Sequence, residues 1–172
     1  MSENSLRYST VLFDWGDTVM RDYPERTTPM VEWETVEVID GIAEVLAYLQ
    51  SSGRRLVLAT SAAISDENQI RGALARGGLD GYFSNIYCFQ NTNLPKGETF
   101  YRYILSDLVI AASNVLMVGD GFEKDILAAN AVGIFAVWFN PRSKEIHKSD
   151  VQATVHSMGE VAEFFKSLDG NK

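Results

Sequence analysis

Residues 115–139 have the sequence VLMVGDGFEKDILAANAVGIFAVWF, which predicts a strand, a helix and a second strand in succession. The two strands, residues 115–118 and 134–139, are apolar throughout. The helix between them, residues 123–131, ends before Gly133, a residue type that commonly closes helices. Strands without a polar face are typical of parallel sheets that are covered by helices on both sides.

The same alternation extends over the rest of the chain. Further strands are expected at residues 8–13, 56–59, 86–89 and 152–155. Further helices are expected at residues 42–49, 66–76, 98–108 and 158–168. This order predicts an α/β fold, a three-layer, Rossmann-like parallel sheet with helices on both faces.

Length and composition are those of one soluble globular domain. The 172 residues are 46% hydrophobic and 22% charged, which excludes disorder for most of the chain. We expect a single domain over residues 1–172, with a core at about 7–168 and loose tails at 1–6 and 169–172. The single cysteine, Cys88, excludes an internal disulfide. No stretch has the length of a membrane span or the pattern of a signal peptide, so a cytoplasmic protein is expected.

The charge balance limits the class of partner. Fifteen Lys and Arg against 23 Asp and Glu give a net charge of −8, which argues against nucleic acid. A small phosphorylated ligand is still possible, because one local basic group or a bound cation can override net charge.

The residues directly after the strands are the candidate site, because ligands of such sheets bind beyond the carboxyl ends of the strands. These residues are 14–18, Thr60 with Ser61, and 119–121. Taken singly they have ordinary explanations: Asp14 and Asp120 suit turns and helix starts, and Lys96 suits a solvated surface. Their joint order is more informative.

Asp14, Thr60, Lys96 and the motif Gly119-Asp120-x4-Asp125 occur in an order that resembles the haloacid dehalogenase (HAD) superfamily of phosphohydrolases. The resemblance covers residues 8–168. Its most specific part is residues 118–126, followed by Ala128, Ala129 and Gly133, and residues 12–19 are nearly as close.

The resemblance implies a Mg²⁺-dependent phosphohydrolase that acts on a small phosphorylated substrate or a phosphoprotein. Asp14 would attack phosphorus and form an aspartyl-phosphate, which divides the transfer into two steps. Thr60 would donate to a phosphoryl oxygen, and Lys96 would neutralise phosphate and nucleophile. Asp14, Asp120 and the backbone carbonyl of Gly16 would bind Mg²⁺, with Asp125 in the outer shell or bound through water.

Gly16 departs from the family pattern, in which this position is an aspartate that protonates the leaving group. Asp17, one residue later, is not assigned that role, because its side chain is expected to point away. General acid–base catalysis contributes about 10²–10⁴-fold, so alkyl phosphates should be poor substrates.

Two alternative functions follow from Gly16. One is a catalytically impaired regulatory protein that binds phosphate and cation. The other is a cation-independent haloacid dehalogenase, although that class of enzyme lacks the acidic motif. The phosphonoacetaldehyde hydrolase branch is disfavoured, because no lysine lies between Val19 and Arg55.

Residues 20–55 are too few for a helical cap in addition to the expected helix, so no substantial cap domain and an open site are expected. Residues 30–39 alternate apolar and acidic side chains, as a strand would. We interpret them as an arm whose Trp33 borders the site or a partner subunit of a homodimer. The alternative is a plain edge strand or an extended connection packed on the core.

Overall fold

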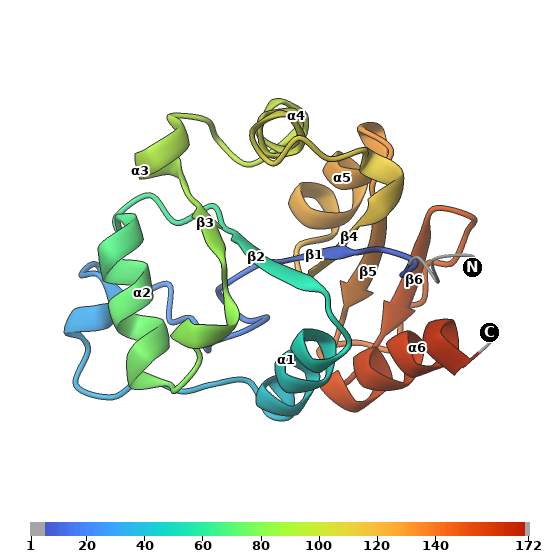
Figure 1. The fold of residues 1–172 in the computed structure, drawn as a ribbon. Coiled ribbons are helices and arrows are strands. Elements are labelled where there is room, and N and C mark those ends of the chain that lie inside the picture. The colour runs from blue at the N-terminus through green and yellow to red at the C-terminus, as the bar shows by residue number, and fades with distance from the viewer. Residues whose placement is uncertain (1–5, 171–172) are drawn as a thin grey trace.

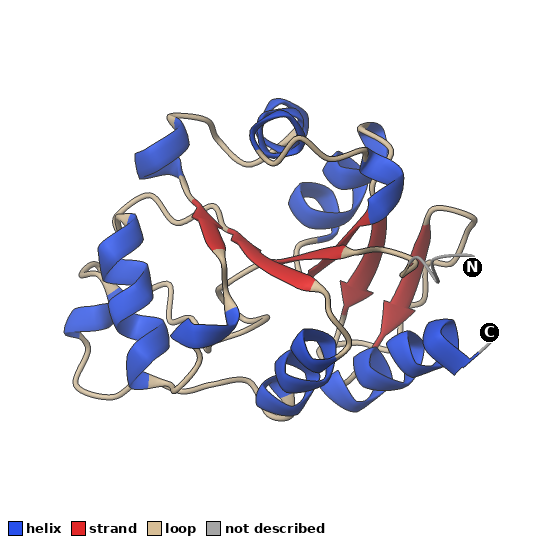
Figure 2. Ribbon diagram, in the orientation of Figure 1, coloured by secondary structure: helices blue, strands red, loops and turns tan. Residues whose placement is uncertain are grey.

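The computed structural model describes residues 6–170, which form a six-stranded, fully parallel sheet in the order β3-β2-β1-β4-β5-β6 (Figures 1 and 2). The strands are β1 Thr10–Phe13, β2 Arg55–Ala59, β3 Asn85–Tyr87, β4 Val115–Gly119, β5 Phe135–Phe139 and β6 Gln152–Val155. The predicted α/β class is confirmed, and the central position of β1 brings its carboxyl end between those of β2 and β4.

Helices cover both faces of the sheet, as predicted (Figure 1). They are α1 Ile42–Ser51, α2 Glu67–Arg76, α3 Phe89–Thr92, α4 Glu98–Asp107, α5 Ala128–Ala131 and α6 Met158–Gly170. Each face of the sheet packs against helices in its own hydrophobic core, and alternate residues of β1 point into one core or the other. Val11 and Phe13 pack in the core with α1, α2 and α6, whereas Leu12 packs in the core with α4 and α5. Every residue of β1 is buried, which explains its unbroken apolar sequence.

Three expected elements differ in detail. The strand expected at residues 86–89 ends at Tyr87, because Cys88 caps the short helix α3 instead of pairing. The helix expected at 123–131 begins as a π-helix, η4 (Phe122–Leu127), and continues as α5. The C-terminal tail expected from residue 169 is wrong, since α6 includes Asp169 and its carboxylate pairs with the buried Arg54 at 2.6 Å. Residues 1–5 and 171–172 of the expected tails lie outside the described residues.

Between β1 and α1 the chain forms a compact loop and no large cap, as expected from its length. The strand interpretation of residues 30–39 is wrong. They contain the short 3-10 helix η1 (Met30–Glu32), and only Val38 makes an isolated antiparallel bridge, to Met20. The remaining 3-10 helices are η2 (Asp80–Tyr82) and η3 (Ala112–Asn114).

Residues 21–40, which we call the front wall, are fixed to α2. The guanidinium of Arg76 donates to the carbonyls of Val31 and Trp33 at 2.9 and 2.6 Å, and also to that of Glu34. A Cβ at Gly72 would lie 2.8 Å from Cγ2 of Val31, so the glycine allows the wall to approach the helix closely. These contacts replace the regular pairing that a strand would have supplied.

None of the helices formed by residues 6–170 is both long and apolar enough to cross a lipid bilayer.

Candidate active site at the carboxyl end of the sheet

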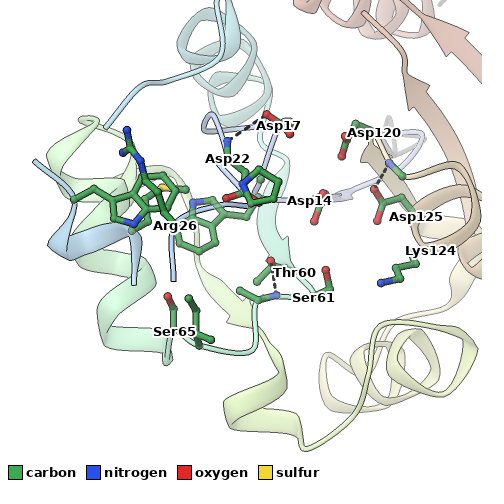
Figure 3. Close-up of a pocket in the computed structure, with 18 of the residues that line it drawn as sticks. Asp14, Asp17, Asp22, Arg26, Thr60, Ser61, Ser65, Asp120, Lys124 and Asp125 are labelled. Carbon is green, nitrogen blue, oxygen red and sulfur yellow. Dashed lines mark hydrogen bonds between the residues drawn. The ribbon is translucent and has the colours of Figure 1, made fainter. Parts of the chain in front are cut away.

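All the residues predicted from the sequence for the site, except Lys96, line one cavity of about 410 Å³ beyond the carboxyl ends of β1, β2 and β4 (Figure 3). Asp14 follows β1, Thr60 follows β2 and Asp120 follows β4. Asp14 is held against β4 because its backbone N–H donates to the Val118 carbonyl at 3.0 Å. The parallel order of the sheet therefore gathers side chains that lie far apart in the sequence.

Three carboxylates converge at one end of this cavity. One oxygen each of Asp14, Asp120 and Asp125 lie within 4.8 Å of one another, and Figure 3 shows these side chains pointing together. Lys96 reaches the cluster from the loop before α4: its Nζ lies 2.8 Å from Asp14 and 2.5 Å from Asp125. The Lys96 side chain is only 1% exposed, so its aliphatic part is buried and its charge faces the carboxylates.

The local backbone around Asp125 explains its orientation. The π-helix η4 begins directly after Gly121, whose N–H donates to Oδ2 of Asp125 at 2.8 Å. The carboxyl lies against Gly119, where a Cβ would be 2.5 Å from the Asp125 Cγ. Position 119 therefore has no space for a side chain, and a Cβ at Gly121 would lie 3.2 Å from Oδ2 of the same carboxyl.

The crowding of negative charge changes the protonation of the cluster. Burial, and then the charges of Asp14 and Asp125, raise the pKa of Asp120 to about 7. Burial and Asp14 also raise the pKa of Asp125 to about 6, although Lys96 opposes that shift. Burial lowers the pKa of Lys96, but the carboxylates of Asp125 and Asp14 outweigh it and raise that pKa above its usual range.

The chemistry of this donor set fits a hard divalent cation. Three carboxylates share one buried ammonium, and oxygen atoms are the ligands that such cations prefer. The Asp120 carboxylate is further contacted by Thr18 Oγ1 at 3.4 Å and by the guanidinium of Arg142 from the exposed rim. Thr18 lies in the predicted stretch 14–18 but was given no role of its own, and Arg142 was not predicted, because a loop arginine has no distinguishing pattern.

The loop after Asp14 carries Gly16 and Asp17. Asp17 adopts a left-handed conformation (φ 56°), as expected for the residue in this turn. Its Oδ1 accepts from the backbone N–H of Asp22 at 3.2 Å and lies 3.7 Å from Arg21 Nη1. The Asp17 carboxylate is thus engaged with the start of the front wall. Gly16 lines the cavity, and a Cβ built on it would first meet the Asp22 side chain.

Asp22 is a cavity residue that the sequence reasoning missed. It lies on the exposed rim beside Asp17, six residues after Gly16, in a segment without a recognisable motif (Figure 3). Partial burial, followed by the charges of Asp17 and Asp14, raises its pKa.

Thr60 and the front wall form the rest of the cavity. Thr60 is buried, and its Oγ1 accepts from the backbone N–H of Ala62 at 3.1 Å, which leaves its hydroxyl hydrogen available. The front wall contributes Arg26 and Trp33, whose guanidinium and indole are 4.6 Å apart. Trp33 therefore borders the cavity, as one version of the arm hypothesis predicts.

The family of the chain follows from its similarity to known proteins. Residues 3–139 match the model of the haloacid dehalogenase-like hydrolase family. The chain belongs to this family. The match includes all five side chains predicted for the site, Asp14, Thr60, Lys96, Asp120 and Asp125.

Two curated phosphatases of this kind are similar to part of the chain. Pyrimidine 5'-nucleotidase PynA of Streptococcus pneumoniae is 32% identical over 78 residues, which cover 44% of this chain and 33% of that protein. Ribulose-1,5-bisphosphate 5-phosphatase of Halopiger xanaduensis is 31% identical over 109 residues, covering 63% of this chain and 44% of that protein. The similarity thus spans less than half the length of either relative.

Solved structures show the same fold over nearly the whole chain. An uncharacterized protein from Listeria monocytogenes serotype 4b has a TM-score of 0.80 and 25% identity, covering 94% of this chain and 98% of that one. A haloacid dehalogenase-like hydrolase from Xanthomonas campestris has a TM-score of 0.72 and 15% identity, covering 97% and 98%.

Proposed function

We propose that this HAD-family protein is a Mg²⁺-dependent phosphohydrolase that acts through an aspartyl-phosphate on Asp14. The observation that carries the proposal is the position of the Asp14 carboxylate, on the cavity wall, 2.8 Å from Lys96 and within 4.8 Å of two further carboxylates. The named activities of the two similar phosphatases support the same reaction class.

Asp14, Asp120 and the backbone carbonyl of Gly16 would hold the cation, with Asp125 beside them. A bound divalent cation supplies positive charge next to the phosphoryl oxygens, which offsets repulsion between a phosphate dianion and the nucleophilic carboxylate. Mg²⁺ suits this role because it needs few protein oxygens and keeps several waters.

The side chains have separate roles in the first step. An Asp14 oxygen bonds to phosphorus while the bond from phosphorus to the leaving oxygen breaks. Lys96 keeps Asp14 oriented and adds a fixed positive charge beside the incoming phosphate. The Thr60 hydroxyl donates to a phosphoryl oxygen.

The substrate class follows from the cavity. At about 410 Å³ and without a cap, it accepts a small phosphorylated molecule, or the phosphorylated side chain of a protein. Nucleic acid is not a proposed partner, given the net charge of −8. A homodimer is a separate hypothesis, which light scattering of the purified protein tests directly.

A phosphate-release screen tests the function. Aryl, acyl and alkyl phosphates are incubated with the protein, with Mg²⁺ and with a chelator, and Asp14→Asn is the matched inactive variant. We expect Mg²⁺-dependent release that Asp14→Asn abolishes, and a mass increase of one phosphoryl group on trapped wild-type protein.

The same screen distinguishes the alternatives. Saturable binding of Mg²⁺ and inorganic phosphate, with no release from any substrate class, would identify a regulatory binding protein. Halide release from a haloacid in the presence of chelator would identify a dehalogenase instead.

A further inference from the structure

Hydrolysis of an alkyl phosphate requires a side chain that gives a proton to the leaving oxygen, and position 16 offers none. The proton-carrying side chains around the cavity are few. Lys96 is held between two carboxylates, and Asp17 is engaged by the Asp22 N–H and Arg21. Lys124 lines the cavity on the side of Asp125 (Figure 3). Asp22 is distinguished from these groups by its place, because the three heavy atoms nearest to a Cβ built on Gly16 all belong to it.

The Asp22 side chain occupies the space beside Gly16. A Cβ built on Gly16 would lie 3.1 Å from Cβ of Asp22 and 3.4 Å from its Oδ2. A side chain at position 16 would therefore project into the space that the Asp22 carboxyl already fills. The same carboxyl lines the cavity that contains Asp14, so the leaving oxygen of a phosphate ester bound at Asp14 would depart into a space that Asp22 also lines.

The hydrogen bonds of Asp22 orient one oxygen and leave the other available. Its Oδ1 accepts from the Tyr23 N–H at 2.9 Å, and its own N–H donates to Asp17 at 3.2 Å. Within residues 6–170 no donor is paired with Oδ2, the oxygen nearest to Gly16. A carboxyl with one anchored oxygen and one free oxygen is arranged to exchange a proton with a bound molecule.

We infer that Asp22 is the acid–base residue of this site and takes the place of a side chain at position 16. In the first step the Asp14 oxygen bonds to phosphorus, the bond to the leaving oxygen breaks, and that oxygen takes the proton of the Asp22 carboxyl. In the second step a water gives a proton to the Asp22 carboxylate and its oxygen bonds to phosphorus. The bond from phosphorus to Asp14 then breaks, its electron pair returns to the carboxylate, and inorganic phosphate leaves. The net reaction is ester plus water to alcohol plus phosphate.

This inference rests on the proposed function, replaces the expectation from the sequence that alkyl phosphates are poor substrates, and also explains Gly16. Cβ atoms 3.1 Å apart are closer than in most packing contacts, so one of them would have to shift, and two carboxylates would repel each other in one small space. The glycine therefore makes room for an acid that is supplied from the front wall. Gly16→Asp alone should therefore disturb the site and lower the activity.

The test compares leaving groups in wild type and Asp22→Asn, with Mg²⁺ present. The asparagine keeps an oxygen for the Tyr23 N–H, so folding should be preserved. With an alkyl phosphate such as glycerol phosphate we expect kcat to fall by about 10²-fold or more, with little change in KM. With para-nitrophenyl phosphate, whose phenolate leaves without a proton, phospho-Asp14 should still form and should accumulate, as seen by intact mass. Glu25→Gln removes an exposed carboxylate from the same segment and is the matched control.

A relocation variant makes the test independent of folding effects. Gly16→Asp combined with Asp22→Gly returns the carboxyl to position 16 and removes the contact, so it should recover alkyl phosphate turnover that Asp22→Gly alone lacks. Unchanged alkyl phosphate kcat in Asp22→Asn would overturn the inference, as would a wild type that hydrolyses only aryl and acyl phosphates. A wild type that neither releases phosphate nor becomes phosphorylated would overturn the proposed function itself.

Discussion

The carboxyl group of Asp125 lies against Gly119, at a distance that excludes any side chain there: a Cβ on Gly119 would be 2.5 Å from the Asp125 Cγ. The end of β4 and the first turn of η4 therefore fit together only because position 119 has no side chain. Asp125 also accepts the Gly121 N–H and contacts Lys96, so moving its carboxyl would disturb the whole carboxylate cluster.

Gly119→Ala should weaken cation binding by about 10–100-fold, the usual effect of disturbing a group that supports metal ligands. Mg²⁺ titration followed by calorimetry measures this change. Gly81→Ala is the matched control, because nothing lies within 4 Å of a Cβ at that position. Equal Mg²⁺ affinity in both variants would show that Asp125 plays no part in holding the cation.

Lys96→Met should destabilise the fold by about 3–5 kcal/mol, since it leaves two buried carboxylates without their partner. Chemical denaturation measures the free energy of unfolding. The control is Lys166→Met, which removes an exposed ammonium 3.0 Å from Glu163 and should cost about 0–1 kcal/mol. If both variants lose the same small amount of unfolding free energy, the contacts of Lys96 with the carboxylate cluster do not stabilise the fold.

The raised pKa of Asp120 predicts how stability depends on pH without a divalent cation. Burial and two neighbouring charges raise the pKa of this carboxyl from 3.8 to about 7, so the folded state holds its proton more tightly than the unfolded state. The resulting stabilisation is complete below about pH 4 and is lost as the pH rises through about 7.

Mg²⁺ should act in the opposite direction, because it binds the ionised carboxylates. Its stabilising effect on the thermal midpoint is expected to be larger at about pH 8 than at about pH 5.5, where protons compete. Thermal unfolding at both pH values, with and without Mg²⁺, measures the difference. Asp120→Asn should remove most of the pH dependence of stability that is seen without Mg²⁺. If the pH dependence persists in that variant, another titrating group causes it.

Trp33→Ala should destabilise the protein by about 3 kcal/mol or more, as for other buried aromatic deletions. The indole is 8% exposed, donates to the Thr28 carbonyl at 2.9 Å and packs against Arg26. We also expect a raised KM for the best substrate of the screen, because the same indole borders the cavity. Trp33→Phe keeps an aromatic ring and should show a smaller effect. A Trp33→Ala protein with unchanged stability, oligomeric state and ligand binding would contradict both versions of the arm hypothesis.

The sequence predicted the sheet and the convergence of the acidic residues for one physical reason. Strands buried on both faces are apolar throughout, and parallel strands bring their carboxyl ends to one edge. The position of Asp14, Thr60 and Asp120 directly after three such strands was therefore enough to predict that they lie together. Lys96 and Asp125 were assigned through the family pattern, and the structure brings both within contact of the same cluster.

Other features depend on contacts that local pattern does not encode. The apolar and acidic alternation in residues 30–39 suggested a strand, but hydrogen bonds from Arg76 hold that backbone in another conformation. Asp169 was assigned to a tail because nothing nearby in the sequence indicates its pairing with Arg54. Asp22 reaches the cavity through the tight loop after Asp14, where three backbone N–H groups donate to the Trp15 carbonyl.

The attachment of the front wall to α2 determines how a substrate could be selected. Arg76 holds three carbonyls of the wall, and Val31 is packed against Gly72, so this side of the cavity has no hinge comparable to that of a separate cap domain. Discrimination between ligands would then depend on a static template of shape and charge, and not on closure after binding. A change of specificity would accordingly require new side chains on the front wall, because no closing motion would contribute to the selection of the substrate.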